Sequence, residues 1–160
     1  MKKNMIHMIV LAMACLFASC QDSSKLVISD LQCEYLNAPL AIDNTTPHFG
    51  WKMTCGQKGT SSSAYQLLVA TELDKLNEEE ADLWNSGKVS SDTSIGIAYG
   101  GKALTSRTQA YWKVRVWNQA DVPSEWSKPS SFGIGMLSEN DWSAEACFIG
   151  VEQADEKSQS

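Results

Sequence analysis

Hydrophobic and polar residues alternate along most of the chain beyond residue 25, and residues typical of turns separate the alternating segments. A β-strand points successive side chains to opposite faces, so this pattern predicts strands that are buried on one side. Seven segments fit it: residues 26–35, 48–53, 64–70, 84–89, 94–99, 111–117 and 130–134. The stretch 71–83 breaks the alternation and predicts a short helical turn or an acidic loop, and Gly100-Gly101 predicts a hairpin turn.

The segment 111–117 has the strongest strand pattern. One of its faces carries three residues suited to a core, Trp112, Val114 and Val116, and the opposite face carries Lys113, Arg115 and Trp117. Seven strands without a long helical segment indicate an all-β protein. We expect an antiparallel β-sandwich of fibronectin-III-like or immunoglobulin-like topology over residues 26–136, with a jelly roll as the alternative.

The first twenty residues have a different character. Two lysines precede an apolar stretch from Met5 to Phe17, which is shorter than the ~20 apolar residues that a membrane-spanning helix needs. A basic start, an apolar middle and small residues before a cysteine resemble a bacterial lipoprotein signal. We expect residues 1–19 to be removed, Cys20 to carry lipid, and residues 20–25 to form the lipidated cysteine and its tether. The alternative is an ordinary signal peptide, since Phe17 stands where such signals usually have leucine.

Composition and charge limit the partners of this exported domain. The 160 residues carry 13 basic and 19 acidic side chains, a net charge of −6. Removal of residues 1–19 leaves 11 basic against 19 acidic side chains, a net charge of −8. Nucleic-acid-binding surfaces are built from clustered Lys and Arg, so a nucleic-acid partner is not expected. We expect an envelope lipoprotein, in the periplasm or at the outer membrane, that contacts the membrane through its lipid anchor alone.

Cysteines and histidines do not form a metal motif in the sequence. Removal of the signal leaves Cys33, Cys55 and Cys147, whose spacing matches no zinc pattern, and His48 is the one remaining histidine. A disulfide between Cys33 and Cys55 is an alternative in an oxidising compartment, although buried thiols are the favoured interpretation. The sequence also lacks a phosphate-binding loop, so neither a metal nor a cofactor is predicted.

One cluster of carboxylates occurs, formed by Glu78, Glu79 and Glu80 together with Asp82. A glycosidase needs two carboxyl groups that face each other across a cleft in different environments. Consecutive glutamates on a polar turn point in different directions instead. His48 accompanies no Gly-x-Ser-x-Gly motif and is interpreted as structural. No catalytic residue is therefore predicted.

Tryptophans are the remaining candidates for a binding site, because a flat exposed ring can stack on a sugar. We expect Trp84, Trp117 and Trp126 at the surface, as a sugar platform or as a contact with a neighbouring domain. The segment 124–127, Ser-Glu-Trp-Ser, resembles a segment of fibronectin-III domains in which cations of a neighbouring strand lie against the tryptophan ring. Lys113 and Arg115 have the phase to form such a structural stack with Trp126 or Trp117, and this is the preferred interpretation.

Several segments together resemble one family of enzymes. LQCEYLNAPLAID at residues 31–43 and PHFGWKM at residues 47–53 are similar to the opening of bacterial α-L-rhamnosidases of glycoside hydrolase family 78. Four further segments match the same N-terminal module in order, so that the resemblance covers nearly all of residues 26–135; they are 64–70, 83–89, 111–117 and 124–127. Residues 141–144 and 148–150 resemble the start of the next β-domain of the family. There the match weakens, because Cys147-Phe148 replaces an apolar-Trp pair.

The resemblance implies a non-catalytic module at the front of a much longer protein, of which this sequence would be a partial chain. The family hydrolyses terminal α-L-rhamnosyl bonds with inversion, using two acidic residues in an (α/α)6 barrel, and no residue here matches that barrel. The module would space and pack against the catalytic and β-domains, its expected partners, with residues 137–160 as the start of the next domain or a polar tail. The alternatives are a free-standing lipoprotein that binds rhamnose-containing glycans and a protein-interaction module.

Overall fold

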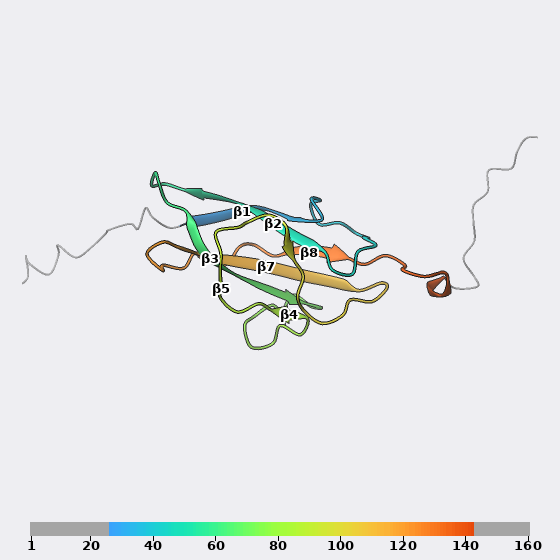
Figure 1. Ribbon diagram of the computed structural model, residues 1–160. Helices are drawn as coiled ribbons and strands as arrows, with labels where there is room; N and C mark the ends of the chain where they lie inside the picture. Colours follow the sequence, from blue (N-terminus) through green and yellow to red (C-terminus); the bar gives the residue numbers. More distant parts are fainter. Residues whose placement is uncertain (1–25, 143–160) are drawn as a thin grey trace, which may run out of the picture.

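Residues 26–142 form two antiparallel β-sheets that pack face to face in the computed structural model, which describes this part of the chain (Figure 1). The first sheet has the strand order β1-β2-β6, with β1 at Leu26–Cys33, β2 at His48–Cys55 and β6 at Ile97–Ala98. The second sheet has the order β4-β3-β7-β8, with β5 also paired to β3. Its strands are β3 (Ser62–Ala70), β4 (Trp84–Asn85), β5 (Val89–Ser90), β7 (Gln109–Asn118) and β8 (Ser130–Gly133). The predicted all-β sandwich is confirmed, with eight strands described.

The two central strands of the second sheet follow the predicted alternation. In β7 the side chains of Trp112, Val114 and Val116 are fully buried, while Lys113 and Arg115 on the other face remain partly exposed. β3 pairs with β7 from Ser62↔Asn118 to Ala70↔Tyr111 and is buried along almost its whole length. Burying each large apolar side chain stabilises the fold by about 1.5–3 kcal/mol, which makes β3 and β7 the centre of the domain.

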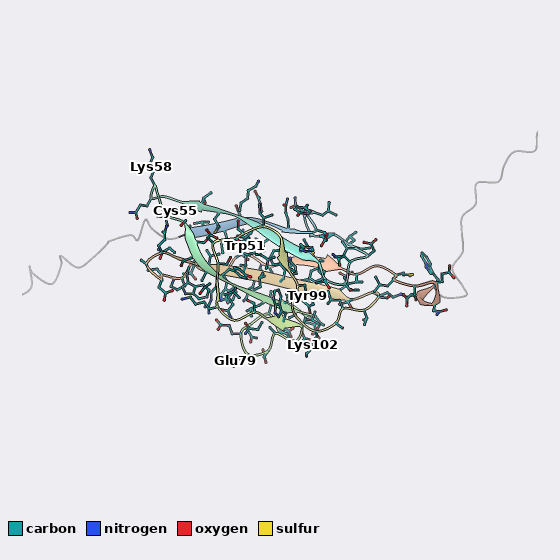
Figure 2. All side chains as sticks on the ribbon, in the orientation of Figure 1. Trp51, Cys55, Lys58, Glu79, Tyr99 and Lys102 are labelled. Carbon is teal, nitrogen blue, oxygen red and sulfur yellow. The ribbon has the colours of Figure 1, made fainter. Side chains whose placement is uncertain are left out.

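Aromatic rings fill the space between the sheets. The Phe49 ring centroid lies 4.6 Å from that of Trp112 and 5.7 Å from that of Phe132, so a residue of β2 joins the two layers. Trp51 packs edge-on against Tyr65 at 5.6 Å. Trp51 and Tyr99 lie within the body of the sandwich, whereas Lys58 and Glu79 lie at its periphery (Figure 2). One core therefore serves both sheets.

Several predicted elements differ from those observed. The first strand ends at Cys33, because Glu34 and Tyr35 adopt positive φ angles of 50° and 62° in a tight turn. Residues 71–83 form a loop without a helix, in agreement with the second of the two alternatives predicted for them, an acidic loop. The hairpin predicted at Gly100-Gly101 is wrong, since these residues cross from β6 in one sheet to β7 in the other. A Cβ on Gly101 would lie 2.4 Å from the Leu83 carbonyl oxygen, so glycine is needed there for close packing.

Cys33 and Cys55 are not joined to each other. The β1–β2 register pairs Cys33 with Phe49 and Cys55 with Leu26, which places the two cysteines at opposite ends of the strand pair. Cys33 is buried, and burial together with the neighbouring Glu34 raises the pKa of its thiol to about 12. A buried and protonated thiol behaves as a small hydrophobic side chain.

The described chain enters and leaves the sandwich at opposite ends (Figure 1). β1 begins at one end, and the segment after β8 leaves at the other, where it forms the short 3-10 turn η2 (Glu139–Asp141). None of the helices found among residues 26–142 has the length and hydrophobicity to cross a membrane. The predicted signal at 1–19, Cys20 with its tether to residue 25, and residues 143–160 lie outside the described residues.

Candidate functional site

The outer face of the second sheet carries the predicted tryptophan–cation stack, and residues 124–127 build its edge. This segment runs beside β7: the Ser124 and Ser127 amides donate to the Val116 and Val114 carbonyls at 2.7 and 2.8 Å. In return the hydroxyls of Ser124 and Ser127 accept hydrogen bonds from the Val116 and Val114 amides, each at 3.1 Å. Side-chain hydroxyls thus complete the edge of β7 beyond its pairing with β8, and they hold Trp126 beside the strand.

Two cations of β7 lie over the Trp126 ring. Lys113 Nζ is 4.9 Å and Arg115 Cζ is 4.6 Å from the ring centroid. Arg115 also lies 4.9 Å from the Trp117 ring, on which Lys88 Nζ packs at 4.8 Å. Partial burial lowers the pKa of Lys113 below its usual range, with the nearby Glu78 acting in the opposite direction. Each of the two tryptophan rings therefore contacts two cations, and Arg115 contacts both rings.

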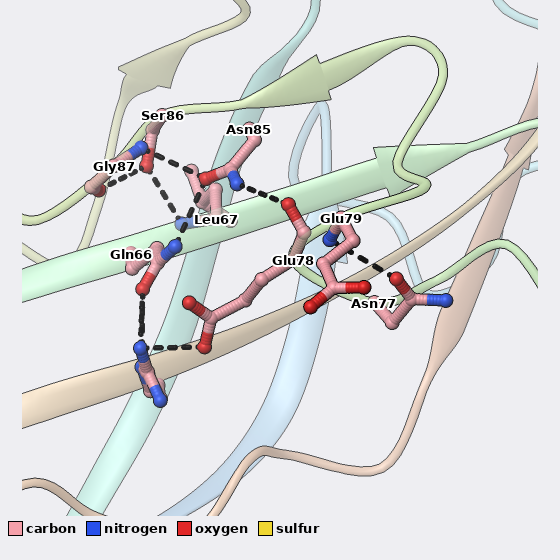
Figure 3. A network of polar contacts seen from close by, with 9 residues as sticks. Gln66, Leu67, Asn77, Glu78, Glu79, Asn85, Ser86 and Gly87 are labelled. Carbon is pink, nitrogen blue, oxygen red and sulfur yellow. Dashed lines mark hydrogen bonds and ion pairs between the residues drawn. The ribbon is translucent and has the colours of Figure 1, made fainter.

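Polar contacts tie Arg115 to Gln66 of β3 and to Glu78 of the loop after β3, and Figure 3 shows the network around these two partners. The Arg115 guanidinium donates to Gln66 Oε1 at 2.8 and 3.1 Å and pairs with Glu78 Oε1 at 2.7 Å. Gln66, 4 % exposed in the middle of β3, donates through Nε2 to Asn85 Oδ1 at 2.9 Å. The side-chain amide of Asn85 in turn donates to the Glu78 backbone carbonyl at 3.0 Å. β3, β4, β7 and the acidic loop are therefore held together by one network.

A shallow depression of about 470 Å³ lies beside this network, lined by Asn77, Glu78, Glu79, Glu80, Lys113 and Trp126. The three glutamates of the predicted carboxylate cluster lie on its lining, whereas Asp82 does not, and members of the cluster have separate local partners. Glu78 pairs with Arg115. Glu80 accepts from the side-chain amide of Asn77 at 2.5 Å. Asp82 accepts from the Thr71 hydroxyl at 2.7 Å. These bonds fix the loop that bears them, as expected of structural carboxylates.

The carboxyl groups with shifted pKa values do not suit proton donation at neutral pH. Burial tends to raise the pKa of Asp82, but the hydrogen bonds from Thr71 outweigh it and hold that pKa below the usual range. For Glu34 burial acts in the same direction and is outweighed by hydrogen bonds from His48 and Asn44. The general acid of a glycosidase needs a raised pKa instead. Within residues 26–142 no group of His, Cys, Asp and Glu residues could hold a metal ion.

His48 has a structural position. Its Nδ1 lies 3.0 Å from Glu34 Oε1, and its backbone amide donates to the same oxygen at 2.7 Å. The side-chain amide of Asn44 donates to the same Glu34 oxygen, at 3.0 Å. Glu34 thereby joins the end of β1, the connecting loop and the start of β2.

The three candidate tryptophans have different environments. The prediction that Trp117 faces solvent is wrong: it is 8 % exposed, because Lys88 and Arg115 lie over its ring. Trp84 is half-buried and packs in the aromatic core, 5.4 Å from the Tyr99 ring and 6.4 Å from that of Phe49. Trp126 remains partly exposed beneath its two cations. The three rings do not form one flat platform.

Sequence reasoning missed Gln66, which connects Arg115 to Asn85. The available signal was a single polar residue inside an otherwise apolar central strand. Such a residue must find a hydrogen-bond partner on folding, because an unsatisfied buried amide is costly. The partner itself could not be inferred, since the Gln66↔Arg115 pairing depends on the β3–β7 register.

Comparison with known proteins shows consistent similarity to one group. The family model described as "Rha78A-like, N-terminal immunoglobulin domain" matches residues 28–138. An α-L-rhamnosidase of Formosa agariphila is 42 % identical over 89 % of this chain and 15 % of the relative. One of Streptomyces avermitilis is 39 % identical over 76 % of this chain and 12 % of the relative.

Two solved structures resemble the fold at similar identity. The crystal structure of Streptomyces avermitilis α-L-rhamnosidase complexed with L-rhamnose aligns with a TM-score of 0.70 and 38 % identity, over 74 % of this chain and 11 % of that one. The structure of α-L-rhamnosidase from Dictyoglumus thermophilum aligns with a TM-score of 0.70 and 35 % identity, over 75 % and 14 %. The chain thus spans 11 to 15 % of the length of these proteins.

Proposed function

Because the chain belongs to the family of Rha78A-like N-terminal immunoglobulin domains of glycoside hydrolase family 78, we propose that it serves as the non-catalytic first module of a larger α-L-rhamnosidase. In that role it would space the catalytic part from the point of attachment and pack against the domains that follow. The observation that carries this proposal is the match over residues 28–138, combined with the small share of each relative that the chain spans. Rhamnoside hydrolysis would belong to the remaining length of the parent protein.

The geometry of the domain suits a spacer. Entry and exit lie at opposite ends of the sandwich, so the module adds its own length between the segments that it joins (Figure 1). The ten-residue strand β7 alone extends over roughly 33 Å at ~3.3 Å per residue. A shared core between the sheets makes this length rigid.

An activity assay tests the non-catalytic assignment. The purified chain should release no more product from an aryl α-L-rhamnoside than a buffer blank does. The α-L-rhamnosidase of Streptomyces avermitilis at the same molar concentration is the positive control. Hydrolysis by the chain alone would contradict the proposal. Binding of rhamnosylated oligosaccharides by the chain, measured by calorimetry, would instead favour a glycan-binding role.

The basic and apolar character of residues 1–19 supports a further part of the proposal, export and attachment to the cell envelope through lipid on Cys20. Acyl chains would hold the module on a membrane through their buried methylenes, at ~0.8 kcal/mol for each. Mass spectrometry of the protein expressed in a bacterium should find acyl groups on Cys20. Unchanged membrane fractionation of the Cys20→Ser variant would contradict lipidation.

A further inference from the structure

Large apolar side chains are exposed where the chain leaves the sandwich. Beyond β8, Met136 is 38 %, Leu137 39 % and Trp142 56 % exposed. Leu40, 85 % exposed, lies on the neighbouring segment, which is bonded to the chain at the end of β8: the Gly133 amide donates to the Pro39 carbonyl at 2.9 Å, and the Gly135 amide donates to the Ile42 carbonyl at 2.8 Å. These four residues, Leu40, Met136, Leu137 and Trp142, are called the exit face below.

A carboxylate holds this segment against the body of the domain. Asp141 Oδ2 accepts from the Ser106 hydroxyl at 2.5 Å and from the Leu137 and Ser138 amides at 3.0 and 2.8 Å. The Arg107 guanidinium donates to the Asp141 backbone carbonyl at 2.5 Å. The hydrogen bond from Ser106, followed by those from Ser138 and Leu137, lowers the pKa of Asp141, so its carboxylate is ionised at neutral pH. We call this set of bonds the Asp141 clamp.

The Asp141 clamp orders the segment without burying it. η2 contains no buried residue, so its order does not come from the hydrophobic effect within this domain. Fixing backbone residues costs conformational entropy, and exposing apolar side chains to water gives no compensation. Polar bonds that hold apolar side chains in solvent are instead suited to presenting them to a second surface.

We infer that the exit face is the docking surface for the domain that follows this one in the parent polypeptide, and that the Asp141 clamp fixes its orientation. This inference rests on the proposed function and deepens it. The family match ends at residue 138, within the exit segment, while the relatives extend to many times this length. The occupant is therefore an apolar surface of the next domain, brought to the exit face by chain connectivity.

The clamp can be tested on the chain itself by hydrogen exchange. We expect the Leu137 and Ser138 amides to be protected at neutral pH, and Asp141→Ala to accelerate their exchange by about tenfold or more. Glu139→Ala is the matched control, since it removes a carboxylate from the same turn that takes no part in the clamp. Unprotected amides in the unsubstituted chain would overturn the clamp.

Docking can be tested in a chimera of a whole enzyme. Residues 26–142 replace the segment that they match in the Streptomyces avermitilis α-L-rhamnosidase, and limited proteolysis measures cleavage at the junction. We expect the double variant Leu137→Ser/Trp142→Ser to be cut about tenfold faster than the unsubstituted chimera. The control Leu73→Ser, which changes an exposed leucine of the loop after β3, should leave the rate unchanged.

The outcomes separate this inference from the proposed function. If the unsubstituted chimera is cut as fast as the isolated chain, the domain does not pack on its neighbour and both proposals fail. If the chimera is protected and Leu137→Ser/Trp142→Ser is equally protected, packing stands but uses another surface, and the inference alone fails. Concentration-dependent dimerisation of the chain that Trp142→Ser abolishes would assign the exit face to a second copy, and would also overturn it.

Discussion

Arg115 is the residue on which the outer face of the second sheet depends. Its side chain lies against two tryptophan rings, donates twice to the buried Gln66 and pairs with Glu78. Lys113, two residues earlier on the same face, meets the Trp126 ring. Removal of Arg115 would therefore leave the buried Gln66 oxygen without its donor, whereas removal of Lys113 would remove a ring contact.

We expect Arg115→Ala to lower the free energy of unfolding by about 2–4 kcal/mol, because it leaves the buried Gln66 oxygen without its donor and removes the ring contacts. Arg115→Lys keeps the charge but loses the planar fork, and should cost less. Lys113→Ala should cost about 0.5–1 kcal/mol, since it removes a single ring contact. Urea unfolding measures all three. Equal losses for Arg115→Ala and Lys113→Ala would contradict the role given to Gln66.

A pH effect is expected from Glu34. Hydrogen bonds from His48 and Asn44 outweigh burial and hold its pKa below the usual range in the folded state. A carboxyl group with a lowered folded pKa stabilises the protein above the unfolded pKa, and this contribution is lost as the pH falls through the folded pKa. Carboxyl groups titrate between about pH 6 and pH 3. Over this interval the free energy of unfolding of the unsubstituted chain should therefore fall by more than that of Glu34→Gln. Parallel pH profiles of urea unfolding for the two proteins would refute this.

At the residue scale, alternation placed Trp112 and Arg115 on their correct faces, because the period of a strand is fixed by its backbone. The same rule misplaced Trp117, which lies on the outer face but is buried there. Its cover comes from the long side chains of Lys88 and Arg115. Alternation assigns a face to a side chain, whereas burial of an outer ring depends on which long side chains lie over it, here Arg115 of the same strand and Lys88 just before β5.

The edge of β7 depends on residues that belong to no strand. Ser124 and Ser127 supply hydroxyl acceptors for two β7 amides that have no β8 partner, and both serines are buried. Ser124 also donates its hydroxyl proton to the Glu125 carbonyl at 2.7 Å. Ser124 and Ser127 are three positions apart, whereas their partners Val116 and Val114 are two positions apart. The segment 124–127 therefore bonds to β7 with one residue more than a regular strand would need.

We expect Ser124→Ala and Ser127→Ala each to lower the free energy of unfolding by about 1–3 kcal/mol, because each leaves a buried β7 amide unsatisfied. Hydrogen exchange should quicken at the Val116 amide in the first variant and at the Val114 amide in the second. Ser29→Ala, a substitution at an exposed position of β1, is the control and should change neither. Unchanged exchange at both valines would mean that the hydroxyls do not serve the edge.

At the element scale, the long strands β2, β3 and β7 were predictable, whereas the short elements between them were not. Residues 84–89 were expected as one strand but form β4 and β5 on the same edge of β3, separated by Gly87 at a φ of +61°. Gly100-Gly101 has the composition of a hairpin, yet Gly101 is required because its backbone approaches Leu83 and Trp84. Local sequence specifies a turn only when no distant contact determines the backbone path.

At the scale of the whole molecule, the sandwich and its partners follow from different information. The fold class came from strand count and alternation, and the resemblance placed the domain at the front of a longer enzyme. The Asp141 clamp could not be inferred from sequence, because Ser106 and Asp141 lie 35 residues apart and are brought together only by the folded domain. The stability of the isolated domain depends on contacts between the two sheets, and Phe49 makes such contacts with Trp112 and Phe132.

Phe49→Ala should therefore destabilise both sheets together. The ring is fully buried against Trp112 and Phe132 of the second sheet, and its removal leaves a cavity between the layers, at a cost of about 3–5 kcal/mol. Because one core serves both layers, amide protection in β1–β2 and in β3–β7 should fall by the same factor in native-state hydrogen exchange. Val27→Ala, an exposed position of the first sheet, should cost less than about 0.5 kcal/mol. Loss of protection in β1–β2 with β3–β7 unchanged would show that the sheets unfold separately, and a domain of that kind could not serve as a rigid spacer.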